Sequence, residues 1–143
     1  MICVDSSVVV KWLVPEELSD QARALRRAML ARAEPMVAPV LLAMEVNNVI
    51  LQRTRGSNAI SDAEASDLLT HFLSAEVELY DPVALHRNAF TIATTFRLPA
   101  IYDAYFLALA ADAECPFWTA DMKLVNTLDG RLPYVRWLGH FRI

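Results

Sequence analysis

Short apolar runs alternate along this chain with longer stretches in which hydrophobic residues recur every three or four positions. The short runs predict five strands, the last of them marginal, at residues 2–4, 35–38, 77–80, 117–119 and 134–137. The longer stretches predict helices at residues 8–13, 18–33, 40–55, 61–73, 82–96, 104–113 and 122–128. Strands that alternate with helices form βαβ units, so the pattern predicts an α/β protein with a parallel sheet covered by helices on both faces.

Several residues mark where these elements should begin or end. Ser7 precedes the first predicted helix, so we expect its hydroxyl to cap that helix. Ser61 is followed three residues later by Glu64, which is the pattern of a capping box. Gly56 marks the end of the helix at residues 40–55, and Pro39 should stop the second strand.

The 143 residues fit a single domain, residues 1–143, that buries its own core. A hydrophobic fraction of 55% with three glycines excludes a disordered or low-complexity chain. This apolar fraction is high for a domain of this size, and surplus apolar surface is typical of an oligomer. Cys3 and Cys115 form neither a disulfide framework nor a C-x-x-C pair, which predicts buried, reduced thiols.

The sequence predicts a soluble, cytoplasmic protein that does not contact a membrane. No apolar run reaches the roughly 18 residues of a spanning helix, and Asp5 and Lys11 lie too early in the chain for a signal peptide. The net charge of −4 argues against a nonspecific nucleic-acid binder, because such proteins are usually basic. Cations held by a cluster of acids would reverse that sign locally.

Three aspartates lie where predicted elements end or begin. Asp5 directly follows the first predicted strand, and Asp121 lies two residues after the fourth. Because the carboxyl ends of parallel strands share one rim of the sheet, these two acids should meet there. Asp103 lies near the start of the helix at residues 104–113. Each of the three could instead be a helix cap, and for Asp103 taken alone capping is the simpler explanation.

Glu45 lies on or beside the apolar face of the helix predicted at residues 40–55. Leu41 and Leu42 precede it by four and three residues, and Val49 follows it by four. A buried glutamate costs several kcal/mol unless it is paired or bound to a cation. The alternative is an edge position from which the carboxylate reaches solvent. A plain α/β domain without a site would leave this placement unexplained.

Carboxylates that lie close together raise one another's pKa unless a divalent cation neutralises them. Oxygen ligands without His or Cys favour Mg²⁺ or Mn²⁺ over zinc, and such sites are suited to phosphodiester hydrolysis. Other chemistries fit less well. His71, His86 and His140 are scattered, and the sequence has neither a G-x-S-x-G motif nor a glycine-rich phosphate loop.

Four segments that contain these acids resemble the PIN-domain ribonucleases, specifically the VapC-type toxins of bacterial and archaeal toxin–antitoxin pairs. They are VDSSVVVKW at residues 4–12, PVLLAMEVNN at 39–48, YDAY at 102–105 and TADMKL at 119–124. Each segment is short, but together they span most of the chain in the family's order. The sequence does not depart from the family at any of the four acids.

The resemblance implies a five-stranded parallel sheet in the order 3-2-1-4-5 and an α/β/α sandwich. It also implies Mg²⁺- or Mn²⁺-dependent RNA cleavage, a homodimer, and inhibition by a small VapB-type antitoxin. By this similarity Asp5, Glu45, Asp103 and Asp121 are catalytic, and the three aspartates hold the metal. The Thr119 and Ser7 hydroxyls would contact the acidic side chains and not the metal itself.

Other functions remain open at this point. A catalytically silent PIN-like interaction module would not need intact acids. An aspartate-dependent phosphatase of the haloacid-dehalogenase type would carry a second acid two residues after the first, where this chain has Ser7. The apolar helices between residues 41 and 73 suggest a dimer interface and an adjoining antitoxin groove. Arg53 or Arg55 could flank the site, or could simply end a solvated helix.

Overall fold

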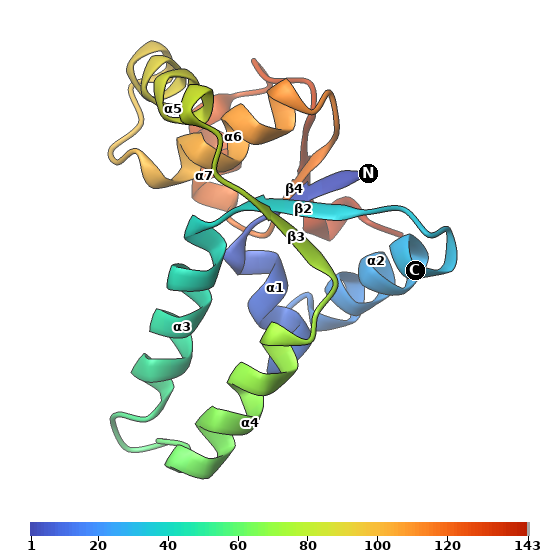
Figure 1. Cartoon of the computed structure of the whole chain (residues 1–143), viewed down its shortest axis with the longest axis vertical. Coiled ribbons are helices and arrows are strands. Elements are labelled where there is room, and N and C mark those ends of the chain that lie inside the picture. The colour runs from blue at the N-terminus through green and yellow to red at the C-terminus, as the bar shows by residue number, and fades with distance from the viewer. Residues whose placement is uncertain (143) are drawn as a thin grey trace.

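The computed structural model, which describes residues 1–142, contains a parallel sheet of five strands in the order β3-β2-β1-β4-β5 (Figure 1). Both the strand number and the order agree with the family resemblance. The strands are β1 (Ile2–Val4), β2 (Met36–Pro39), β3 (Val77–Tyr80), β4 (Phe117–Thr119) and β5 (Val135–Trp137). Pro39 is the last residue of β2 and pairs with Tyr80, so it ends the strand from inside, one residue later than predicted.

Helices cover both faces of this sheet, as the alternation predicted. The helices are α1 (Ser6–Leu13), α2 (Ser19–Ala31), α3 (Leu41–Arg53), α4 (Asp62–Leu73), α5 (Val83–Phe96), α6 (Tyr102–Asp112), α7 (Met122–Leu128) and the 3-10 helix η1 (Leu138–His140). Figure 1 shows α1 to α4 below the sheet and α5 and α6 above it. The chain moves outward through β2 and β3 and then returns past β1 to β4. Right-handed crossovers therefore place the earlier and later helices on opposite faces.

The core lies on both sides of the central strands. β1 is buried throughout, whereas the edge strand β3 is largely exposed. Most of α6 is buried, which fits a helix that is apolar all round. Its Phe106 stacks on Phe117 of β4 with ring centroids 6.2 Å apart. These contacts fix α6, and with it Asp103, against the centre of the sheet.

The two thiols are buried and free, as predicted. Burial raises the pKa of Cys3 well above its usual value and also raises the pKa of Cys115, so both thiols stay protonated and unreactive. The capping box of Ser61 and Glu64 is present at the start of α4. Within residues 1–142, no helix combines the length and hydrophobicity that crossing a membrane requires.

Candidate active site

Asp5 leaves the end of β1 and caps α1. Its Oδ1 accepts a hydrogen bond from the backbone N–H of Val8 at 3.1 Å and another from the Ser7 hydroxyl at 2.5 Å. Only 7% of the residue is exposed. The prediction that Ser7 caps this helix was wrong, because the helix begins at Ser6 and the capping oxygen belongs to Asp5.

Ser7 instead joins the ends of two strands. Its hydroxyl accepts a hydrogen bond from the backbone N–H of Ala120 at 2.8 Å and lies 3.4 Å from the Thr119 hydroxyl. Thr119 is fully buried, and its hydroxyl accepts a hydrogen bond from the backbone N–H of Asp121 at 3.0 Å. The two hydroxyls therefore lie between Asp5 and Asp121 and connect the loops that carry them.

Asp121 caps α7 in the way that Asp5 caps α1. Its Oδ1 accepts hydrogen bonds from the backbone N–H groups of Lys123 at 2.7 Å and Leu124 at 3.2 Å. Capping and a role at the sheet rim are therefore compatible, because both aspartates lie at the carboxyl end of a central strand and at the start of a helix. The cap holds one carboxylate oxygen of Asp121 and fixes the direction of the other.

Asp103 does not cap its helix. The helix begins at Tyr102, one residue before Asp103 and two before the predicted start, and the capping position belongs to Ile101, which makes no side-chain cap bond. The simpler explanation that the sequence offered for Asp103 is therefore wrong. Its half-buried carboxylate lies in the first turn of α6, where the positive end of the helix dipole favours an anion.

Burial raises the pKa of Asp5 from 3.8 to about 7. Hydrogen bonds from Ser7, Thr119 and Val8 oppose this rise, whereas the negative charge of Asp103 adds to it. The free energy of placing a charge at this position is therefore high, and a bound cation would lower it.

Asp103 connects the four acids electrostatically. Burial raises the pKa of Asp103, and the charge of Asp121 contributes. Burial likewise raises the pKa of Glu45, with a further contribution from the charge of Asp103 and an opposing one from the Ser6 hydroxyl. Because Asp103 also raises the pKa of Asp5, each acid is within electrostatic reach of another. The structure thus brings together all four residues that the sequence singled out.

No cation within residues 1–142 neutralises this cluster. The salt bridges lie elsewhere: Glu16 pairs with Lys11 and Arg53, Asp81 with His86, and Glu34 with the N-terminal amine. Arg53, which the sequence placed beside the site as one option, is therefore held by Glu16 of the α1–α2 loop.

The donor set fits a hard divalent cation, since it offers only carboxylate and hydroxyl oxygens. As the side chains lie, no three acidic, His or Cys groups among residues 1–142 are close enough to hold one ion together. Side-chain rotation on binding would have to draw the carboxylates inward. Burial is the largest cause of the raised pKa values of Asp5, Glu45 and Asp103, and the charge of a neighbouring acid adds to each.

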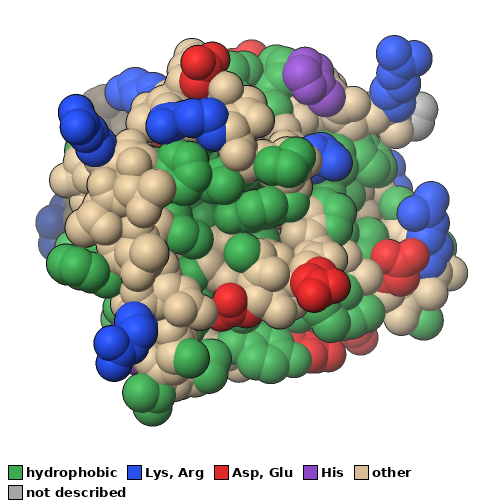
Figure 2. Space-filling view, turned by 90° about the horizontal axis from the view of Figure 1, so that it is seen from above, with side chains coloured by type: hydrophobic (Ala, Val, Ile, Leu, Met, Phe, Trp, Pro, Cys, Tyr) green, Lys and Arg blue, Asp and Glu red, His purple; other side chains and the backbone are tan. Residues whose placement is uncertain are grey.

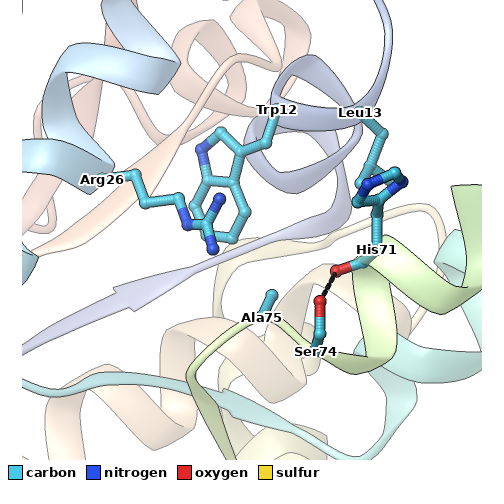
Figure 3. Close-up of a pocket in the computed structure, with 6 residues that line it drawn as sticks. All are labelled: Trp12, Leu13, Arg26, His71, Ser74 and Ala75. Atoms are coloured by element: carbon cyan, nitrogen blue, oxygen red, sulfur yellow. Dashed lines mark hydrogen bonds between the residues drawn. The ribbon is translucent and has the colours of Figure 1, made fainter.

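Sequence reasoning missed Ser6, whose hydroxyl lowers the pKa of Glu45. The signal was present, because Ser6 lies inside the segment that resembles the family, but no periodicity shows that the first turn of α1 faces α3. It also missed a pocket of about 250 Å³ against α1, α2 and α4, lined by Trp12, Leu13, Arg26, His71, Ser74 and Ala75 (Figure 3). None of the four acids lines this pocket.

The sequence of residues 2–138 matches the PIN domain family, and the chain belongs to that family. No curated protein matches the chain. Solved structures that share its fold include the following three. FitAB bound to an IR36 DNA fragment superposes with a TM-score of 0.69 at 14% identity, covering 100% of this chain and 99% of that one. FitAcB from Neisseria gonorrhoeae gives 0.59 at 16% identity, covering 98% and 99%. Mycobacterium tuberculosis VapC20, a toxin that cleaves the sarcin–ricin loop, gives 0.62 at 17% identity, covering 88% and 94%.

Proposed function

We propose that this protein is a Mg²⁺- or Mn²⁺-dependent endoribonuclease and the toxin of a toxin–antitoxin pair. One observation carries the proposal: four acids gather at the carboxyl rim of the central strands, coupled through Asp103 and without a neutralising side chain in the described residues. PIN domains are generally nucleases, and the fold is shared with toxins such as VapC20.

Asp5, Asp103 and Asp121 would hold the divalent cation. When bound, the cation would polarise the phosphodiester and stabilise the departing oxygen. Ser7 and Thr119 orient the loops that carry Asp5 and Asp121, so that the side-chain rotation needed for metal binding starts from fixed backbone positions.

Glu45 approaches the rim from the side, on α3. Burial raises its pKa, which makes the carboxylate a stronger base toward a proton of the attacking water. The Ser6 hydroxyl limits this rise and gives the carboxylate a fixed neighbour. We assign Glu45 to proton transfer and the three aspartates to metal binding.

Charge is consistent with recognition through a bound cation. The face seen in Figure 2 exposes hydrophobic side chains across its middle and carries its basic side chains toward the edges. The net charge of −4 also differs from the positive charge that is usual for a nonspecific nucleic-acid binder. A cation held by Asp5, Asp103 and Asp121 would supply positive charge at the site itself.

The partner we propose is a VapB-type antitoxin, and we propose that a segment of this antitoxin binds in the pocket of Figure 3. The Arg26 guanidinium lies 5.3 Å from the centroid of the Trp12 ring, and its Nε is a buried donor without a hydrogen-bond partner in residues 1–142. A peptide carbonyl or carboxylate laid along this pocket would satisfy that donor.

We further propose a homodimer, because Leu51 of α3 and Leu73 of α4 remain 49% and 67% exposed. Light scattering at micromolar protein concentration tests this proposal.

The decisive experiment compares cleavage of a structured RNA pool in Mg²⁺, in Mn²⁺ and in EDTA. Asp103→Asn is the sharpest variant, because Asp103 does not cap a helix and its loss should leave the fold intact. Asp67→Asn, on the exposed face of α4, is the matched control. We expect cleavage by the wild type and the control that EDTA abolishes, and almost none by Asp103→Asn. Cleavage that survives both EDTA and Asp103→Asn would contradict the proposal, as would an inactive wild type.

A further inference from the structure

A second pocket, of about 300 Å³, opens along the same rim of the sheet. It lies where β2 and β3 end, and it is closed by the starts of α3 and α6. Its lining is Pro39, Val40, Leu41, Met44, Asp81, His86, Ile101, Tyr102 and Tyr105. Ligand sites of parallel sheets form at this rim, and the volume falls at the lower end of the range for small-molecule pockets.

The pocket adjoins the acid cluster. Met44 immediately precedes Glu45 on α3, and Tyr102 immediately precedes Asp103 on α6, and both line the pocket. A polymer whose phosphate reaches the acids would therefore have its neighbouring unit at the mouth of this pocket.

The lining distinguishes a neutral flat group from a phosphate. Among the lining residues are a carboxylate, Asp81, and no lysine or arginine, so a phosphate would be repelled. Tyr102 and Met44 are 58% and 60% exposed, and each offers a large apolar surface. Aromatic side chains of this kind stack on nucleobases.

One wall of the pocket is polar and fixed in place. His86 Nδ1 lies 2.8 Å from the Tyr105 hydroxyl, and His86 Nε2 lies 3.3 Å from Asp81 Oδ1. The His86 and Tyr105 rings also meet edge to face, with centroids 5.5 Å apart. This arrangement joins the start of α5 to α6 and presents donors and acceptors to whatever enters.

We propose that this pocket binds an unpaired nucleobase next to the scissile phosphate, stacked on Tyr102 and read by the polar wall of His86, Tyr105 and Asp81. The inference rests on the proposed ribonuclease function and deepens it. It makes Tyr102 a substrate-binding residue, and His86, whose two ring nitrogens contact Tyr105 and Asp81, a residue that positions these two polar groups.

The test uses Tyr102→Leu, which removes the ring, Tyr102→Phe, which keeps it, and Phe90→Leu as the control. Phe90 is an aromatic residue of α5 that is 63% exposed and does not line this pocket. Products from a randomised RNA pool are sequenced, and KM and kcat are measured on the preferred substrate. We expect Tyr102→Leu to raise KM roughly 5- to 100-fold, the range of one lost stacking contact, and to lose base preference at one position beside the cut. Tyr102→Phe and Phe90→Leu should retain both.

A measurement of RNA binding shows whether this pocket binds a base even if the protein is not a ribonuclease. Short fluorescent oligoribonucleotides are titrated in Ca²⁺, which removes any need for cleavage. Weaker binding by Tyr102→Leu, with Phe90→Leu unchanged, supports the pocket even if the wild type cleaves none of the RNAs tried. Equal binding by all variants overturns it. A change in sedimentation with unaltered RNA binding also overturns it, because a second copy of the chain would then cover the pocket.

Discussion

The Ser7 hydroxyl accepts a hydrogen bond from the backbone N–H of Ala120, 113 residues later in the chain, at 2.8 Å. The same hydroxyl donates to Asp5 at 2.5 Å. One side-chain oxygen thus ties the carboxyl end of β1 to that of β4, the two places from which Asp5 and Asp121 emerge.

Ser7→Ala should weaken both the fold and the site. It leaves the Ala120 N–H without its acceptor, which costs about 1–3 kcal/mol. It also removes a hydrogen bond that lowers the pKa of Asp5, so the acid limb of the pH–activity profile should move to higher pH. Denaturant unfolding and the pH profile measure the two effects, with Ser66→Ala on exposed α4 as the control. An unchanged profile would contradict this role for Ser7.

Asp5 should make the metal-free protein less stable as the pH rises. Its pKa is about 7 in the folded state against 3.8 as the reference, so the folded state binds more protons between these values. Stability should therefore fall from about pH 4 to about pH 7 and stay low above it, by up to about 4 kcal/mol. Asp5→Asn, which can still accept from Val8 and Ser7, should lose this fall and melt higher than wild type at pH 8. Thermal unfolding in EDTA at pH 5 and pH 8 measures it, and a wild type more stable at pH 8 would refute it.

Mn²⁺ affinity should rise with pH through about 7, since the cation and the proton compete for Asp5. Below that value each pH unit should weaken binding by up to about tenfold. Asp5→Asn, Asp103→Asn and Asp121→Asn should each reduce affinity, because each removes a ligand. Isothermal titration at pH 6, 7 and 8 tests both statements. Equal affinity in wild type and all three variants would remove the metal assignment.

Glu45→Gln should separate catalysis from binding. The substitution keeps the shape of the side chain and removes its charge, so we expect kcat to fall by about 10²- to 10⁴-fold, the usual contribution of a general base. RNA affinity in Ca²⁺ should stay nearly unchanged. Single-turnover cleavage in Mg²⁺ beside a gel shift in Ca²⁺ provides the comparison. If Glu45→Gln cleaves RNA at the wild-type rate, Glu45 has no catalytic role and is only an edge residue whose carboxylate reaches solvent.

The alternation of short apolar runs with helical spacing was enough to predict all five strands and the seven α-helices, because a buried parallel sheet requires continuous apolar strands. It did not predict the short 3-10 helix η1. A predicted helix start was wrong where two nearby residues could each cap the helix. Asp5 and Ser7 can both cap a helix, and only the contact between Ser7 and Ala120 decides between them. The start of α6 carried no capping signal, since Ile101 has no polar side chain.

The three aspartates were singled out from their places at strand and helix ends, and Glu45 from its place beside an apolar helix face, but the electrostatic coupling of the four acids could not be predicted. Strand order decides which rim positions become neighbours, and here the resemblance supplied that order. The approach of Ser6 to Glu45 and the pairing of Arg53 with Glu16 depend on how α1 packs beside α3. Contacts between elements leave no periodic trace in the sequence.

The pairing of β1 with β4 has a consequence for synthesis. Asp5 is synthesised long before its neighbours at the rim, which belong to β4 and the loop to Asp121 and are made only after residue 116. A nascent chain that stops earlier lacks both the strand that flanks β1 and one of the four acids. A messenger RNA broken upstream of that point would thus yield only fragments in which this rim of the sheet cannot form.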